Sequence, residues 1–138
     1  MDDYLSGVMS VGGQKYALPL TEIDSIESSY QIKVIDDSPF LEVDDKGVAV
    51  YDLDENHNVL EDKRRLCVVI GDIALMADEF ESRQLDKRHL RAVPTLVDTG
   101  VVAQLYFSTL DNEFIQILRM SSLPSYLAGE QRPYTTDS

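Results

Sequence analysis

The 138-residue chain is poor in the residues on which catalysis, metal binding and disulfide bonding depend: it has one cysteine, two histidines and no tryptophan. A single cysteine excludes an internal disulfide. Cys67 lies in the apolar run Leu66–Ile70, which predicts a small buried side chain and not a reactive thiolate. The histidines, His57 and His89, lack the spacing of a recognised metal site. We therefore predict a protein that is not an enzyme, with no catalytic residue, no metal site and no cofactor.

Positive charge is also scarce, with 12 Lys and Arg against 25 Asp and Glu and a formal net charge of −13. Nucleic-acid phosphates and anionic membrane surfaces repel such a protein, so we expect neither as a partner. The negative charge fits either attraction to a basic protein surface or solubility alone, and both interpretations stay open.

Long apolar runs are missing as well. No stretch approaches the roughly 20 apolar residues that a membrane-spanning helix needs. The segment Met1–Tyr4 has no basic region and does not resemble a signal peptide. We expect a cytoplasmic protein that does not insert into a membrane.

The chain is rich in short apolar segments separated by turn residues, a pattern typical of an all-β barrel or sandwich. The expected strands cover residues 5–11, 16–20, 30–34, 48–51, 65–70, 73–77, 101–107 and 113–118. Residues 36–39 are expected to form a loop and residues 44–47 a turn, with short helical turns at 86–90 and 122–127. We expect one domain over residues 1–128 and a flexible tail over residues 129–138.

One hairpin pattern occurs twice. The first copy has a turn at Gly13 and runs on to Glu22-Ile23, and the second has its turn at Gly71-Asp72 and runs on to Asp78–Phe80. Each copy has an apolar strand, a glycine turn, a second strand with Ala-Leu, and an acidic residue beside an apolar one. Glycine suits such turns because it reaches positive φ without steric cost. The pattern indicates either an internal duplication or a chance match between short strands.

The acidic loop of residues 52–62 is the one candidate ion-binding segment. Four residues have the EF-hand spacing for positions one, three, five and seven, namely Asp52, Asp54, Asn56 and Asn58. However, His57 replaces the glycine of position six, and Lys63 replaces the glutamate of position twelve. A solvated acidic loop is the preferred interpretation, with a calcium site as the alternative.

A basic cluster stands out against the negative chain and contains Arg83, Lys87, Arg88, His89 and Arg91. We favour a solvated surface for it. Contact with an acidic partner, or pairing with the protein's own acidic loops, is the alternative.

The order of these segments resembles the CheW-like coupling domains of bacterial chemosensory systems. The resemblance spans about residues 5–120 and is carried by segments of the family pattern: the strand of Gly13–Leu20, Ile23-Asp24-Ser25-Ile26, Pro39-Phe40-Leu41, Lys46-Gly47 followed by Val48–Leu53, Cys67–Ile70, Ile73–Phe80 and Val101–Leu118. The family usually has Glu where Ser25 stands and Arg where Lys46 stands. Glu27 could supply the carboxylate that the family's glutamate provides at the position of Ser25.

The resemblance implies a mainly all-β fold of two small five-stranded β-barrel subdomains around a shared core, with short helical turns. It implies a scaffold without catalytic activity, whose partners are the regulatory domain of a CheA-type histidine kinase and the cytoplasmic tip of a methyl-accepting chemoreceptor. The partner-binding residues carried over by position are Ile23, Ser25, Lys46, Gly47 and Val48. We expect Gly47 to sit at positive φ in its turn. A β module that binds a small ligand or a metal is the alternative function.

Overall fold

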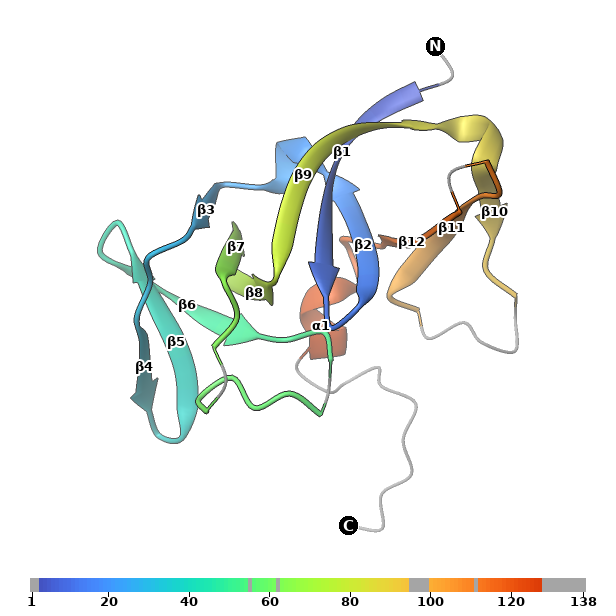
Figure 1. The fold of residues 1–138 in the computed structure, drawn as a ribbon. Coiled ribbons are helices and arrows are strands. Elements are labelled where there is room, and N and C mark those ends of the chain that lie inside the picture. Colours follow the sequence, from blue (N-terminus) through green and yellow to red (C-terminus); the bar gives the residue numbers. More distant parts are fainter. Residues whose placement is uncertain (1–2, 55, 62, 95–99, 111, 128–138) are drawn as a thin grey trace, which may run out of the picture.

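The computed structural model describes residues 3–54, 56–61, 63–94, 100–110 and 112–127, which form two six-stranded sheets. Sheet A contains β1 (Asp3–Val11), β2 (Gln14–Pro19), β9 (Glu79–Asp86), β10 (Leu90–Ala92), β11 (Val102–Ser108) and β12 (Glu113–Leu118). Sheet B contains β3 (Ser25–Glu27), β4 (Ile32–Ile35), β5 (Ser38–Val43), β6 (Lys46–Tyr51), β7 (Leu66–Ile70) and β8 (Ile73–Ala77). The sheets lie side by side, with sheet B on the left of Figure 1 and sheet A on the right.

Helical structure is limited to short segments in the described part of the chain. These are the 3₁₀ turns η1 (Leu20–Glu22) and η2 (Lys87–His89) and the single α-helix α1 (Leu123–Leu127). Within the same residues, no helix has the length and apolar character to cross a membrane. The all-β prediction is therefore confirmed, as are the short helical turns near residues 86–90 and 122–127.

The expected five-stranded barrels are replaced by open sheets of six strands. Sheet A has the order β10-β11-β12-β2-β1-β9, and sheet B has the order β4-β5-β6-β8-β7-β3. Each sheet combines the hairpin of one half of the chain with four strands of the other half. Strand β9 pairs with β1 of the first half, and β3 pairs with β7 of the second. The outermost strands of each sheet do not pair with one another, so neither sheet closes into a hydrogen-bonded barrel.

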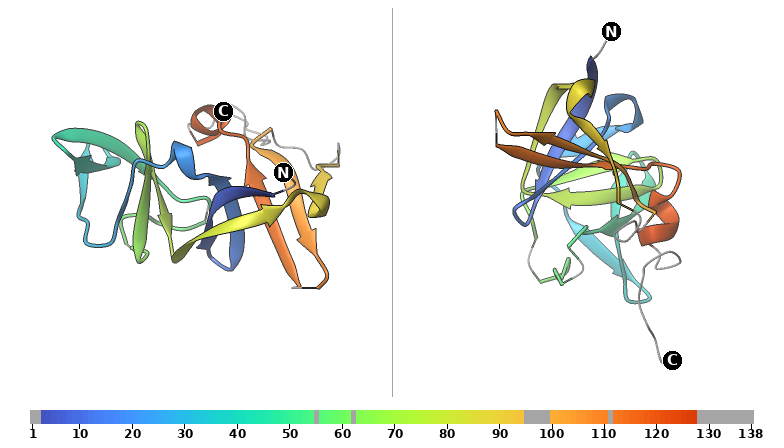
Figure 2. Two further views of the ribbon diagram at one scale, coloured as in Figure 1. Left: turned by 90° about the horizontal axis from the view of Figure 1, so that it is seen from above. Right: turned by 90° about the vertical axis from the view of Figure 1, so that its right-hand side faces the viewer.

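The two halves of the chain, β1–β6 and β7–β12, have the same topology. Each begins with a hairpin in one sheet and then sends four strands into the other sheet. The returning strand of each hairpin pairs in parallel with the last strand of the other half, β2 with β12 and β8 with β6. The hairpin that occurs twice in the sequence is thus part of a repeat that covers the whole fold. Figure 2 shows the two hairpins between the outer strands of the two sheets.

Three hydrophobic clusters explain why the hairpin strands are apolar on both faces. Along β7 and β8 successive side chains alternate between two cores: Cys67 and Val69 face the core of sheet B, while Val68 and Ile70 face a core shared by both sheets. In β1, Val8 faces the core of sheet A and its neighbour Met9 faces the shared core. Burial on both faces requires apolar side chains at successive positions, as the sequence has there. The expectation that Cys67 is buried is confirmed.

Tight turns connect the strands of both hairpins. Gly12 and Gly13 both have positive φ, and Gly71 has positive φ while Asp72 does not. Two further turns in sheet B use aspartate pairs at positive φ, Asp36-Asp37 and Asp44-Asp45. Aspartate tolerates this conformation better than most residues because its short side chain bonds locally to the backbone.

Gly47 is not in such a turn, and the expectation that it has positive φ is wrong. The turn is only the pair Asp44-Asp45, and Lys46 and Gly47 already belong to strand β6. The loop expected over residues 36–39 is likewise shorter, because Ser38 and Pro39 belong to strand β5.

Candidate partner-binding site

Each half of the chain binds the hairpin turn of the other half through an aspartate. Asp78, just after β8, accepts a hydrogen bond at Oδ2 from the amide of Gly12 over 2.9 Å, and its own amide donates to Ser10 O over 2.7 Å. These two bonds join the second half of the chain to the turn between β1 and β2.

The same two bonds recur at the other turn. Asp24, just before β3, accepts at Oδ2 from the amide of Gly71 over 2.8 Å, and its amide donates to Val69 O over 2.8 Å. In both cases the carbonyl acceptor lies two residues before the glycine. The hydrogen bonds between the halves are therefore the same at both turns, although Gly13 has positive φ and Asp72 does not. The two turns also differ in the side chains that surround them.

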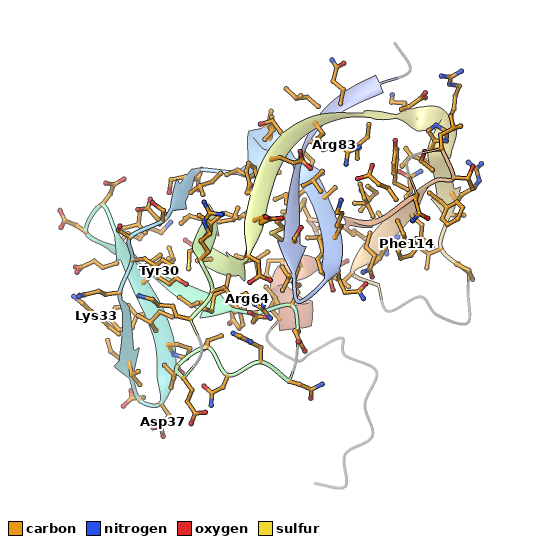
Figure 3. The ribbon with its side chains drawn as sticks, in the orientation of Figure 1. Tyr30, Lys33, Asp37, Arg64, Arg83 and Phe114 are labelled. Atoms are coloured by element: carbon orange, nitrogen blue, oxygen red, sulfur yellow. The ribbon has the colours of Figure 1, made fainter. Side chains whose placement is uncertain are left out.

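A largely buried arginine binds the aspartate of the first turn, although Gly12 itself is exposed and the Asp78 side chain is 43% exposed. Arg64 Nη1 donates to both carboxylate oxygens of Asp78 over 2.9 and 3.1 Å, and Arg64 Nε donates to Asp52 Oδ2 over 2.6 Å. The side chains of Arg64 and Asp52 are 9% and 2% exposed. We call Gly12, Asp78, Arg64 and Asp52 the closed corner. In Figure 3 Arg64 lies near the centre of the molecule, between the sheets.

Ionisation follows from these contacts. Burial works against the charged form of Asp78, but hydrogen bonds from the Gly12 amide and from Arg64 outweigh it, so the pKa of Asp78 is lowered. The hydrogen bond to Asp52 raises the pKa of Arg64 against the effect of burial. The backbone carbonyl of Arg64 also accepts a hydrogen bond from the hydroxyl of Tyr30, which fixes this segment to the first half of the chain.

The closed corner accounts for part of the acidic loop. Asp52 and Asp54 occupy two of the EF-hand-like positions, and both point to Arg64, with Asp54 Oδ2 3.9 Å from Arg64 Nη2. The described residues contain no group of three or more His, Cys, Asp or Glu side chains placed to hold a metal ion. These observations favour an internal structural role for the two aspartates over the calcium alternative.

The second turn has no such cover. Asp24 is exposed and forms no ion pair among the described residues. Beside it, Lys46 Nζ lies 2.7 Å from Asp72 Oδ1 and donates to Gly71 O over 3.3 Å, with the Lys46 and Asp72 side chains 54% and 87% exposed. The hydrogen bond between the Lys46 and Asp72 side chains raises the pKa of Lys46 and lowers that of Asp72. We call Asp24, Gly71, Asp72 and Lys46 the open corner.

A pocket of 420 Å³ adjoins the open corner. Its acidic side carries Glu22, Asp24 and Asp72, and its apolar side carries Ile73 of β8 and Leu123 and Pro124 of α1. No lysine, arginine or histidine lines it among the described residues. The arrangement suits a cationic group with an apolar stem.

The five residues carried over by the family resemblance lie in two environments. Lys46 and Gly47 are exposed at the start of β6, and Ser25 follows Asp24 at the start of β3. Val48 is 1% exposed and belongs to the core of sheet B, and Ile23 is half-buried against the shared core. Lys46 thus reaches the open corner, while Val48 and Ile23 lie behind it.

The sequence interpretation missed both carboxylates of the open corner. The carboxylate that pairs with Lys46 is Asp72, and not Glu27, which we suggested in place of the family's glutamate. The repeat offered a signal for Asp24, because Asp24 and Asp78 both follow an apolar residue after a hairpin. Glu22, which was matched to the acidic residues of the second copy, lies in η1 two residues too early.

The basic cluster is only partly the solvated surface that we favoured. Arg83 forms two hydrogen bonds of 2.5 and 2.6 Å to Glu113, which also pairs with Lys15 over 3.0 Å. The hydrogen bonds from Arg83 lower the pKa of Glu113 to about 2, against the effect of burial. Arg88 is exposed and pairs with the nearby Asp86 over 2.6 Å. Internal pairing, the alternative, is correct for Arg83.

Comparison with known proteins gives a structural match without a sequence match. No family model matches the chain, and no curated protein matches its sequence. The crystal structure of the scaffolding protein TtCheW from Thermoanaerobacter tengcongensis is similar, with a TM-score of 0.70 and 17% identity over 84% of this chain and 88% of that chain. The present chain therefore has a CheW-like fold.

Proposed function

We propose that this protein is a non-enzymatic cytoplasmic scaffold that couples a CheA-type histidine kinase to chemoreceptors. The observation that carries the proposal is the similarity to the scaffolding protein TtCheW along most of both chains. The partners would be the kinase's regulatory domain and the cytoplasmic tip of a methyl-accepting receptor. The apolar interiors of both sheets and the internal use of Asp52, Asp54 and Arg64 agree with a protein that acts through its surface.

Within this proposal the open corner is the partner contact. Lys46, Gly47 and Ser25 would lie at or beside the contact surface, because Lys46 and Gly47 are exposed and Ser25 adjoins the exposed Asp24. Ile23 and Val48 would hold η1 and β6 in place from within the cores. A fixed backbone with exposed charges at its rim is the arrangement that gives a protein interface its specificity.

Affinity capture tests the function. The purified protein is immobilised and exposed to the cytoplasmic and membrane fractions of its source cell, and bound proteins are identified by mass spectrometry. We expect a chemosensory histidine kinase or a methyl-accepting receptor among them. Recovery of neither, from cells that express both, would contradict the coupling function.

A pair of variants tests the contact surface. Lys46→Glu reverses a charge at the open corner and should change recovery of the partner without lowering the melting temperature, because Lys46 is exposed. Lys33→Glu is the matched control, since Lys33 is 53% exposed and forms a similar ion pair of 2.9 Å with Glu42 on the outer strands of sheet B. Equal recovery with both variants would remove Lys46 from the contact surface.

A further inference from the structure

The two corners have the same backbone bonds, but only one of them contains a guanidinium group. At the closed corner, Asp78 Oδ2 accepts from the Gly12 amide and from Arg64 Nη1 together, over 2.9 Å each. At the open corner, Asp24 Oδ2 accepts from the Gly71 amide over 2.8 Å, and no arginine among the described residues reaches this carboxylate. The equivalent carboxylate of the other half thus shows which group such a corner binds.

We propose that the open corner receives an arginine side chain of a partner protein, with its guanidinium on Asp24 as Arg64 lies on Asp78. The inference rests on the proposed function in that the partner is a protein, and it deepens that function by naming the side chain that the partner supplies.

The segments that follow the last strand of each half explain why one corner is covered and the other is not. Asp52, just after β6, and Arg64, just before β7, both lie at the closed corner. After β12, the chain turns into α1, whose Leu123 and Pro124 form one wall of the 420 Å³ pocket beside Asp24. The second half therefore places apolar side chains where the first half places an arginine.

The lining of the pocket fits arginine in both of its parts. Glu22, Asp24 and Asp72 provide negative charge for the guanidinium, while Ile73 and Pro124 can pack on an aliphatic stem. Arginine suits the site better than lysine because its planar group donates two parallel hydrogen bonds to one carboxylate. Lys46 pairs with Asp72 at the rim and forms no ion pair with Asp24 among the described residues, although its charge also acts on Asp24. The net charge of −13 also speeds the approach of a basic partner.

The test is an NMR titration of the whole ¹⁵N-labelled protein with the peptide acetyl-Leu-Arg-Leu-amide. The control peptide has citrulline in place of arginine, which keeps the shape and removes the charge. We expect the Gly71 and Asp72 amides to shift with the arginine peptide and to stay unchanged with the citrulline peptide. Equal shifts with both peptides, or no shift with either, would overturn the proposal.

Two variants sharpen the titration. Asp24→Asn retains an oxygen that can accept from the Gly71 amide and removes the charge, so we expect the affinity for the arginine peptide to fall at least fivefold with the melting temperature unchanged. Asp37→Asn removes the same charge at the tip of the β4–β5 hairpin, at the outer edge of sheet B (Figure 3). Asp37 does not line the pocket, so this change should leave the affinity unchanged. Equal losses in the two variants would indicate a general charge effect and overturn the proposal.

Arg132 lies outside the described residues, and an Arg132→Gln variant tests whether an arginine of this chain is the occupant. If only the Arg132→Gln variant binds the arginine peptide, the occupant is the chain itself and the assignment to a partner is wrong.

The Asp24→Asn protein is also used in the affinity capture. If it recovers the kinase or receptor as well as the wild type does, the arginine proposal fails while the coupling function stands. If the wild type recovers neither, the function fails, and the peptide titration still decides whether the pocket binds arginine.

Discussion

The closed and open corners share their backbone hydrogen bonds and differ in what covers them. In each, an aspartate from one half of the chain accepts a bond from the turn glycine of the other half, over 2.9 Å at Gly12 and 2.8 Å at Gly71. At the closed corner the aspartate also binds a buried arginine, whereas at the open corner it faces a pocket. The comparison teaches that the backbone bonds belong to the fold, while side chains decide whether a corner serves stability or is available for binding.

The largest effect should come from removing the arginine of the closed corner. Arg64→Met removes the guanidinium from the buried Asp52, which keeps the Asp54 amide at 2.9 Å and His57 at 3.7 Å, and breaking a buried ion pair costs about 3–5 kcal/mol of unfolding free energy. Urea denaturation measures it. Arg65→Met is the matched control, because Arg65 is exposed, forms no ion pair among the described residues, and should give a near-unchanged free energy. A loss at Arg64 below about 1 kcal/mol would show that the cover contributes little.

Substituting the turn glycines tests whether the corners share a backbone. Gly12→Ala and Gly71→Ala should each cost about 1–2 kcal/mol, because both residues have φ near +60°. Asparagine should cost less than alanine at either position, since it tolerates this conformation. Gly47→Ala is the control with negative or extended φ, and its Cβ would meet only the ring of Phe40 at 3.4 Å. A cost at Gly47 equal to that at Gly71 would contradict the assigned turns.

Acid should affect the closed corner through Asp78. Its pKa is lowered in the folded protein, so its contribution to stability is complete above the unfolded value of about 4 and is lost as the pH falls through the lower folded value. Asp78→Asn should therefore be less stable than wild type at pH 6, and the difference should shrink as the pH is lowered toward 2. Glu113 also has a lowered pKa, of about 2, but it is present in both the wild type and Asp78→Asn. Its contribution to the pH dependence therefore cancels in the difference between the two proteins. Parallel pH profiles of unfolding free energy would contradict this account.

The smallest effect should come from the ion pair of the open corner. Lys46 and Asp72 are both largely exposed, and solvent screens such pairs. In a double-mutant cycle of Lys46→Gln and Asp72→Asn, we expect no measurable coupling in thermal unfolding. A clear coupling would mean that this pair holds the fold together and would weaken the distinction between the corners.

The sequence was sufficient for the strands that are rich in apolar residues. The apolar runs of the two hairpins and of β11 and β12 were predicted close to their observed bounds. Strand β9 was missed because it is an edge strand with Glu79, Glu81 and Ser82 exposed and only Leu85 fully buried. Strand β4 was expected to be half-buried, but Val34 and Ile35 are exposed, because nothing pairs with its outer edge among the described residues.

The candidate site was predictable only in part. Lys46 was found through the family resemblance, but its partner Asp72 lies in the second half of the chain. Asp24 and Asp78 are separated from the glycines they bind by 47 and 66 residues, so no local pattern shows the contact. Whether each corner is covered depends on how residues 52–64 and α1 pack, which spacing along the chain does not reveal.

Hydrogen exchange at the two turn glycines tests the central claim most directly. The Gly12 and Gly71 amides donate to aspartates over nearly the same distance, so a difference in their protection reports the cover and not the bond. We predict that the Gly12 amide exchanges more slowly than the Gly71 amide in the wild type. In Arg64→Met, the protection of the Gly12 amide should fall to that of the Gly71 amide. Equal protection of the two amides in the wild type would contradict the division into a closed and an open corner.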